Sequence, residues 1–181
     1  MRKLVSALIL LLAMLAPTAA AAPQAVDKLF AQLKAAETHE DAKPIEAQIL
    51  ASFQASGSPT IDLLMHRAEA AQAAGNKDVA RHLLDEVTAL APRYGEGWHR
   101  RALVLAEAGD VANAMRALQQ VVLVNPRQFA AMAELADMLE DIGKQPEALA
   151  LYRRIQDLDP QFDGLKRHID ALSRDVEGQG I

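Results

Sequence analysis

Residues 95–126 read GEGWHRRALVLAEAGDVANAMRALQQVVLVNP. Apolar and small residues recur every three to four positions through 95–108 and again through 111–124, which is the period of an amphipathic α-helix. Gly109 stands between the two runs, at a helix end that favours left-handed backbone. Pro126 follows the second run, where it cannot continue the helical hydrogen bonds. The stretch therefore predicts two helices joined by a tight turn.

The pattern occurs three times, at intervals of 34 residues. The turn glycine recurs as Gly75 and Gly143, and the closing proline recurs as Pro92 and Pro160. Two such triplets, drawn from only nine glycines and eight prolines, indicate an internal repeat. We expect helices at 61–74 and 77–90, 95–108 and 111–124, and 129–142 and 145–158. The corresponding units span 61–94, 95–128 and 129–162, within a repeat region at 59–162.

The unit resembles the tetratricopeptide repeat (TPR), a 34-residue helix–turn–helix. That family has a large residue early in the first helix and a small one four positions later, and Trp98 and Ala102 occupy these places in the middle unit. The resemblance covers residues 61–162. It implies an all-α fold, a right-handed superhelical solenoid of antiparallel helix pairs. Because Trp98 takes a packing position, we expect its replacement by Ala to cost ~3–5 kcal/mol.

Further helices are expected on both sides of the repeats. Two apolar stripes at helical spacing precede them: Val26, Leu29, Phe30 and Leu33, then Ile45, Ile49, Leu50 and Phe53. They predict an N-terminal helical pair over 23–58; alternatively, 28–61 is a degenerate fourth repeat. A capping helix is expected at 163–175, followed by a flexible tail at 176–181.

Residues 1–22 have the pattern of a secretory signal peptide. The basic start Met1-Arg2-Lys3 precedes an apolar run at 4–16 and small residues at 18–22. The apolar run is shorter than the ~20 residues of a membrane span. We therefore expect cleavage after Ala20 or Ala21 and a periplasmic protein; the alternative is an uncleaved membrane anchor.

Composition excludes several classes of function. The chain has no cysteine, which excludes disulfides, Cys-ligated zinc, iron–sulfur clusters and thiol catalysis. The formal net charge of −5 argues against nucleic acid or an anionic membrane as the main partner. This charge also argues against nucleic-acid binding by the segment Trp98-His99-Arg100-Arg101.

No catalytic, metal or cofactor motif is recognisable. The five histidines are His39, His66, His82, His99 and His168, and none belongs to a metal-binding motif such as H-E-x-x-H. Nucleophile-elbow, phosphate-loop and dinucleotide motifs are also missing from the sequence. We therefore expect that the protein is not an enzyme and binds no cofactor. The alternative is an enzyme with zinc held by His99, Glu69 and Glu134.

The family resemblance implies a peptide-binding concave face lined by the first helix of each unit. Carried onto this sequence, its lining residues are Met65, Glu69, Gln72, His99, Leu103, Asp137 and Glu140. The Lys and Asn pattern with which some TPR proteins hold a C-terminal carboxylate is not present. The acidic residues, with Met65 and Leu103 at the floor, favour a basic or apolar segment. An acidic stripe that includes Asp137 could steer such a segment or be a solvated helix face.

The leading interpretation is thus a non-enzymatic adaptor or assembly factor of the cell envelope that binds a peptide segment of a partner. The alternative is a structural protein that self-assembles into homo-oligomers through an exposed end of the repeats. Light scattering without any partner separates the two.

Overall fold

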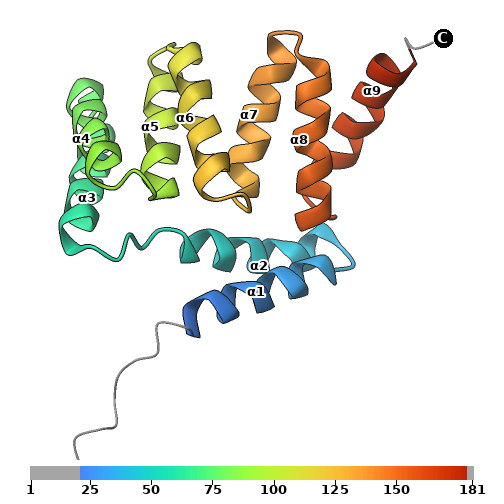
Figure 1. Ribbon diagram of the computed structural model, residues 1–181, viewed down its shortest axis with the longest axis horizontal. Helices are drawn as coiled ribbons and strands as arrows, with labels where there is room; N and C mark the ends of the chain where they lie inside the picture. Colours follow the sequence, from blue (N-terminus) through green and yellow to red (C-terminus); the bar gives the residue numbers. More distant parts are fainter. Residues whose placement is uncertain (1–20, 179–181) are drawn as a thin grey trace, which may run out of the picture.

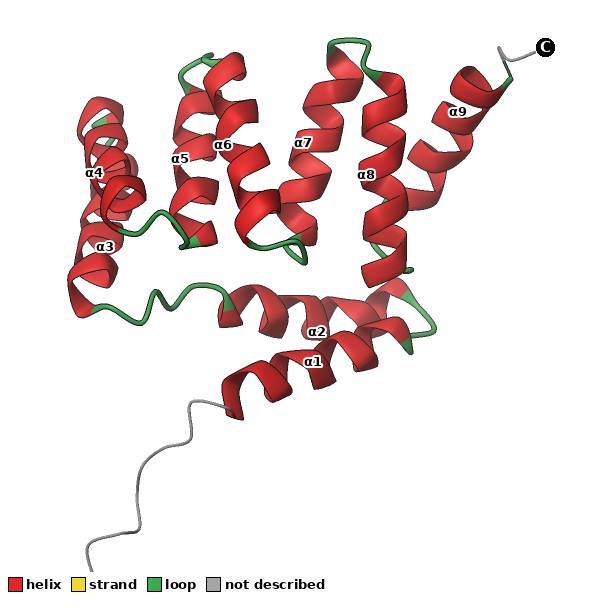
Figure 2. Ribbon diagram, viewed as in Figure 1, coloured by secondary structure: helices red, strands yellow, loops and turns green. Residues whose placement is uncertain are grey.

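The computed structural model describes residues 21–178 (Figure 1). Nearly all of the predicted signal peptide, residues 1–22, lies outside this range, as do residues 179–181. The described part consists of helices joined by turns and short loops, without a strand (Figure 2). The helices are α1 (Ala21–Lys34), α2 (His39–Ser52), α3 (Pro59–Ala73), α4 (Lys77–Leu90), α5 (Gly95–Glu107), α6 (Val111–Val124), α7 (Phe129–Asp141), α8 (Gln145–Leu158) and α9 (Leu165–Glu177).

Helices α3 to α8 form three antiparallel pairs that stand side by side (Figure 1). Their ends lie within two residues of the ranges that the sequence predicts. The turn glycines Gly75, Gly109 and Gly143 have φ values of 77°, 78° and 77°, a left-handed conformation that costs other residues free energy. The predicted all-α architecture is therefore confirmed.

The repeated columns of the sequence form the core between the pairs. Six residues of the second helices are fully buried: Ala80, Ala114, Ala148, Val87, Val121 and Ile155. Alanine is required where helices cross, because axes 8–10 Å apart leave no space for a larger side chain. Each second helix also packs on the first helix of the next unit, which makes the three pairs one continuous stack.

Trp98 is less buried than its repeat position predicts. It packs against the edge of the core, and its indole Nε1 donates to the exposed carbonyl of Pro92 at 3.0 Å. The guanidinium of Arg101 lies 5.8 Å from the ring centroid. At the equivalent place in the third unit, Met132 is fully buried. The expected cost of removing the Trp98 side chain is therefore lower than that of a core aromatic residue.

The N-terminal pair α1–α2 does not continue the stack. It lies across one end of the repeat helices, beneath α5 to α8 in Figure 1. Phe30 of α1 makes an edge-to-face contact with Phe129 of α7, with ring centroids 6.4 Å apart. Arg127 lies over the Phe30 ring at 4.5 Å, and its Nη1 is 2.6 Å from Asp27 Oδ1. The pair thus covers the loops between units, an arrangement different from a fourth repeat stacked in series.

A buried polar contact also holds this pair in place. The side chain of Asp159, at the end of α8, is fully buried and lies beside Glu46 of α2. Burial is the main cause that raises the pKa of Glu46 to about 7, and the nearby Asp159 is the second cause. Burial also raises the pKa of Asp159. His39 Nδ1 lies 3.0 Å from the carbonyl oxygen of Gln161 at the same junction.

Helix α9 closes the other end of the stack. Leu165 and Leu172 are buried against the last unit. The helix extends to Glu177, so residues 176 and 177, expected in the flexible tail, are helical. The reason is tertiary: Val176 packs on the core, and Glu177 lies 2.5 Å from Arg153 of α8.

Helices of the length and hydrophobicity needed to cross a membrane do not occur within residues 21–178.

Candidate functional site

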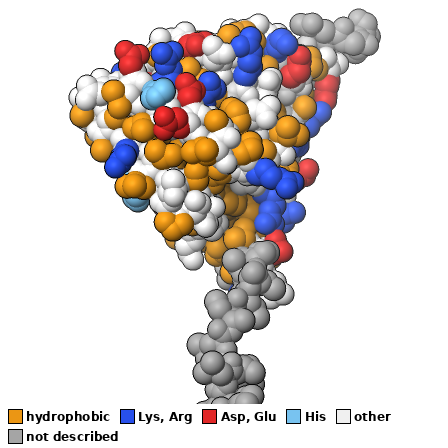
Figure 3. All heavy atoms as spheres, turned by 60° about the vertical axis from the view of Figure 1, so that its left-hand side comes forward, with side chains coloured by type: hydrophobic (Ala, Val, Ile, Leu, Met, Phe, Trp, Pro, Cys, Tyr) orange, Lys and Arg blue, Asp and Glu red, His pale blue; other side chains and the backbone are white. Residues whose placement is uncertain are grey.

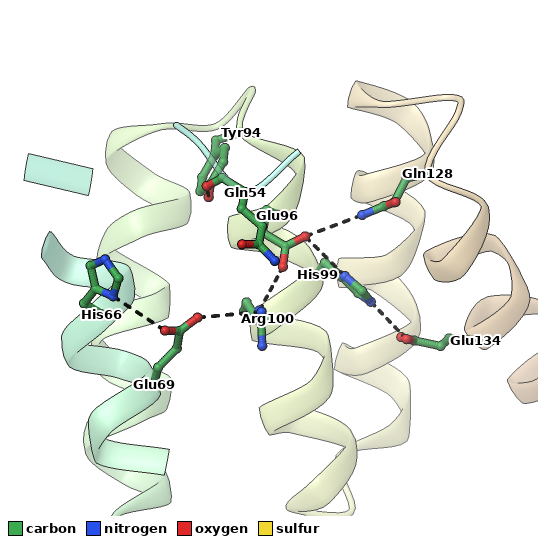
Figure 4. A network of polar contacts seen from close by, with 9 residues as sticks. All are labelled: Gln54, His66, Glu69, Tyr94, Glu96, His99, Arg100, Gln128 and Glu134. Atoms are coloured by element: carbon green, nitrogen blue, oxygen red, sulfur yellow. Dashed lines mark hydrogen bonds and ion pairs between the residues drawn. The ribbon is translucent and has the colours of Figure 1, made fainter. Parts of the chain in front are cut away.

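The first helices α3, α5 and α7 present side chains to a common surface, which we call the first-helix face. A hollow of about 290 Å³ opens at its N-terminal half, between α3, α5 and the segment before α3. Its lining residues are Gln54, Ala55, Asp62, Met65, His66, Glu69, Tyr94, Glu96 and Arg100. The hydroxyl of Tyr94 donates to the carbonyl of Gln54, which fixes the segment at the rim (Figure 4).

An ion-pair chain runs across this face from α3 to α7 (Figure 4). Arg100 Nη2 lies 3.6 Å from Glu69 Oε1, and Arg100 Nε donates to Glu96 Oε1 at 2.8 Å. His99 Nδ1 lies 3.4 Å from Glu96 Oε2, and its Nε2 lies 3.0 Å from Glu134 Oε1. The chain therefore connects the three repeat units through alternating charges.

His99 carries a positive charge in this arrangement. Both ring nitrogens face carboxylate oxygens, and only the imidazolium can donate from both. Burial by itself lowers the pKa of His99, but the hydrogen bonds and charges of Glu134 and Glu96 outweigh burial and raise it to about 9. His99 thus acts as a fixed cation between α5 and α7.

Glu96 is a buried carboxylate, with 7% of its surface exposed. It lies in the first turn of α5, where the helix dipole favours negative charge. Arg100 and His99 supply the opposite charges, and Gln128 Nε2 approaches Glu96 Oε2 at 3.4 Å. These partners explain how a carboxylate is accommodated below the surface of the face.

The C-terminal half of the first-helix face has a second hollow, of about 260 Å³, between α7 and α9. It is lined by Ala130, Ala133, Glu134, Asp137, Tyr152, Phe162, Asp163, Leu165 and His168. The rings of Tyr152 and His168 stack with centroids 4.7 Å apart and form one wall. The floor is therefore apolar and the rim acidic.

The seven lining residues predicted from the sequence have different environments. Met65 and Glu69 line the N-terminal hollow, and Asp137 lines the C-terminal one. Gln72 Nε2 donates to Glu107 Oε1 at 2.9 Å, and Glu140 Oε2 lies 3.1 Å from His168 Nδ1. Leu103 is half-buried on α5 and lines neither hollow, while His99 belongs to the ion-pair chain.

Cationic partners are distributed unevenly over the face. Glu69, Glu96 and Glu134 share the two cations Arg100 and His99. Asp62, which lines the N-terminal hollow, makes no ion pair within the described residues and accepts hydrogen bonds from Ser56. Asp137 and Asp163 have no ion-pair partner among residues 21–178, although Asp137 accepts a hydrogen bond from the Tyr152 hydroxyl. Of the three carboxylates without an ion pair, two therefore line the C-terminal hollow, and both of these are exposed.

The alternative zinc site does not form from the three residues considered. His99 and Glu134 are in contact, but Glu69 pairs with Arg100 instead. Within the described residues, no group of three or more His, Asp or Glu side chains is arranged to hold a metal ion.

Comparisons with known proteins identify the repeats. A family model described as tetratricopeptide repeat matches residues 66–122 and 99–161. A TPR repeat-containing protein of Rhizobium etli is 32% identical over 155 residues, which cover 86% of this chain and 76% of the relative. The chain belongs to the tetratricopeptide repeat family. Proteins of this family are generally non-catalytic interaction modules.

Solved TPR structures share the fold at low sequence identity. The first TPR of Spaghetti (RPAP3), bound to an HSP90 peptide, matches this chain with a TM-score of 0.57 at 17% identity. The match covers 65% of this chain and 93% of the RPAP3 chain. The type III secretion chaperone SycD of Yersinia enterocolitica, in complex with a peptide of the translocator YopD, has a TM-score of 0.56 at 15% identity. The match covers 68% of this TPR chain and 97% of the SycD chain.

The sequence did not identify several residues of the face. Arg100 lies four residues after Glu96, which is the spacing of a local ion pair within a helix. Tyr152 and His168 come from α8 and α9, and only the fold brings them to Asp137 and Glu140.

Proposed function

We propose that this TPR protein binds a segment of another protein along its first-helix face, as an adaptor or assembly factor. The observation that carries the proposal is the series of two hollows on one face, one bordered by α3 and α5 and the other by α7 and α9. A segment that occupies both would contact every repeat unit. The peptide complexes of RPAP3 and SycD support this type of ligand.

The chemistry of the C-terminal hollow favours a basic segment. A lysine or arginine side chain would find the carboxylates of Asp137 and Asp163 at the rim, both exposed and without an ion pair in the described part of the chain. Ala133 and Leu165 supply apolar contacts below them. Such charges would also increase the rate of association with a positively charged segment.

The N-terminal half has different ligand requirements. Glu69, Glu96 and Glu134 are already paired with Arg100 or His99, so a ligand cation that approaches them would have to displace an existing ion pair. Met65, at the bottom of the hollow, and the Tyr94 ring favour an apolar side chain. We therefore propose that the ligand places its basic residue toward α9 and an apolar residue toward α3.

The protein acts in this proposal without catalysis, after export to the periplasm by a cleavable signal peptide. The basic start, apolar run and small residues of 1–22 support export. Intact-mass measurement of the protein from an envelope fraction tests this part. A chain that begins at Ala21 or Ala22 is expected, whereas a full-length cytoplasmic chain would contradict it.

Photocrosslinking in the native cell tests the binding face. A photoreactive residue at Glu69 or Asp137 should give discrete products with another protein, since both positions line hollows. The same residue at Leu123, which is 72% exposed on α6 and lines neither hollow, is the matched control. Equal products at all three positions, or none at Glu69 and Asp137, would refute the proposed face.

A further inference from the structure

The outer side of the first repeat unit is an apolar surface at the end of the stack. One side of α3 and one side of α4 form it, and we call it the end face. Its residues, spaced at three and four positions, are Leu63, Arg67 and Ala70 on α3 and Val79, Leu83, Glu86 and Leu90 on α4. Leu63, Val79 and Leu90 are 51%, 53% and 65% exposed. Figure 3, which brings this end forward, shows hydrophobic side chains gathered among few charges.

Inside the stack, Leu63, Ala70 and Leu83 have buried equivalents, whereas the residues equivalent to Val79 and Glu86 are half-buried or exposed. One repeat after Ala70 stands Val104, which is 1% exposed, and one repeat after Leu83 stands Ala117, also 1% exposed. Two repeats after Leu63 stands Ala131, which is fully buried. The part of the end face around Leu63, Ala70 and Leu83 is therefore a repeat-to-repeat packing surface, and Val79 and Glu86 lie at its edge. Helices α1 and α2 lie across the inter-unit loops, so within residues 21–178 no helix takes the neighbour's place.

The other end of the stack cannot supply that neighbour from a second copy. Helix α9 covers α8, with Leu165 and Leu172 directed into the core. Its exposed residues are charged: Lys166, Arg167, Asp170, Arg174, Asp175 and Glu177. Head-to-tail stacking of chains is thereby blocked. A second copy can pair with the end face only through its own end face, which is the arrangement of a closed two-fold dimer.

The charges of the end face are suited to this pairing. Inside the stack, Arg101 of α5 reaches back to Asp85 of α4, with Nε 2.6 Å from Oδ1. Arg67 is the equivalent of Arg101 in the first unit and makes no ion pair in the described part of the chain. Glu86 pairs there only with His82, at 3.3 Å. Each end face thus offers one cation on α3 and one anion on α4.

We propose that two copies of this chain pair through their end faces about a two-fold axis, with Arg67 of each copy facing Glu86 of the other. α3 of one copy then lies against α4 of its partner, and the symmetry makes both ion pairs. Leu63, Leu83 and Leu90 lose their exposure to water, which supplies the main driving force. The dimer goes beyond the proposed peptide binding and leaves the first-helix face open.

Sedimentation equilibrium of the purified full chain, as the expressing cell delivers it, tests the dimer. Leu63→Asp should raise the dissociation constant at least tenfold, whereas Leu123→Asp on α6 should leave it unchanged. Arg67→Glu and Glu86→Arg should each weaken the dimer, and the double reversal should recover at least half of the lost affinity. Circular dichroism checks that each variant is folded.

Three results would overturn the proposal. The first is a wild-type chain that stays monomeric at about 100 µM. The second is a dimer that Leu63→Asp does not weaken. The third is a double reversal no tighter than either single variant, which would exclude the pairing of Arg67 with Glu86. None of these results bears on peptide binding by the first-helix face.

Discussion

His99 Nε2 lies 3.0 Å from Glu134 Oε1, and this contact joins α5 to α7 across the first-helix face. Because Glu96 holds the other ring nitrogen, the imidazole is positively charged and helps to align two neighbouring repeats. The contact therefore belongs both to the stability of the stack and to the charge of the proposed binding surface.

The ion pairs of His99 predict a pH-dependent stability. The pKa of His99 is raised to about 9 in the folded protein, from about 6.5 in the unfolded chain. The stabilisation is complete below pH 6.5 and is lost as the pH rises through 9, with a size of about 2–3 kcal/mol. His99→Gln should therefore destabilise the protein strongly at pH 7 and little at pH 10.

Urea denaturation at both pH values measures this difference, with His82→Gln on the exposed side of α4 as control. An equal effect of His99→Gln at pH 7 and pH 10 would mean that the imidazole is uncharged in the folded state.

Glu46, at the contact between α2 and the end of α8, predicts a loss of stability in the same direction, as the pH rises. Its pKa of about 7 exceeds the value of 4.5 in the unfolded chain, so the folded state holds the proton more tightly. The stabilisation is complete below pH 4.5 and is lost as the pH rises through 7. We expect the amides of α1 and α2 to exchange hydrogen faster at pH 8 than at pH 5.5, after correction for the intrinsic rate.

Glu46→Gln should remove most of this pH dependence, because the amide stays neutral beside Asp159. Glu147→Gln changes an exposed carboxylate of α8 and serves as the control. Unchanged pH dependence in Glu46→Gln would exclude Glu46 as the titrating group.

Phe129→Ala should destabilise the protein more than Trp98→Ala. Phe129 is 1% exposed and contacts Phe30 and Phe162, so its loss opens a cavity that costs about 3–5 kcal/mol. Trp98 is only partly buried, and we expect about 1–3 kcal/mol for its removal. Chemical denaturation gives both values, and a larger loss at Trp98 would contradict the packing described.

Gly97 predicts a specific steric effect between the first two units. A Cβ at this position would lie 2.7 Å from Cγ1 of Val87, so Gly97→Ala should cost about 1–3 kcal/mol. Val87→Ala removes the clashing methyl group, and the double variant should lose less stability than the sum of the single variants. Additive losses would place the strain elsewhere.

The fold could be predicted well because the repeat signals are local. Gly75, Gly109 and Gly143 mark turns whose conformation needs no tertiary contact, and the apolar period marks each helix. The position of α1 and α2, by contrast, depends on contacts between residues far apart in the sequence. Their apolar stripes show which side is buried, but the partners of Phe30 are Phe129 and Arg127, about a hundred residues away.

The first-helix face could be predicted only in part for the same reason. The resemblance placed Met65, Glu69 and Asp137 on this face, and the structure places them beside its hollows. The charge balance could not be read from composition, since it depends on which acids find a cation. Glu96 and His99 neutralise one another within α5, whereas Asp137 meets only the hydroxyl of Tyr152.

Charge reversal in the C-terminal hollow tests the central claim most directly. With the photoreactive residue at Glu69, the yield of the crosslinked product is compared between the otherwise unchanged chain and a chain carrying Asp137→Lys and Asp163→Lys. Asp157→Lys with Glu147→Lys, two exposed acids of α8, gives the same change of net charge. We predict about a tenfold lower yield for the hollow variant only, with all chains folded; equal yields in the two variants would contradict binding of a basic segment on the first-helix face.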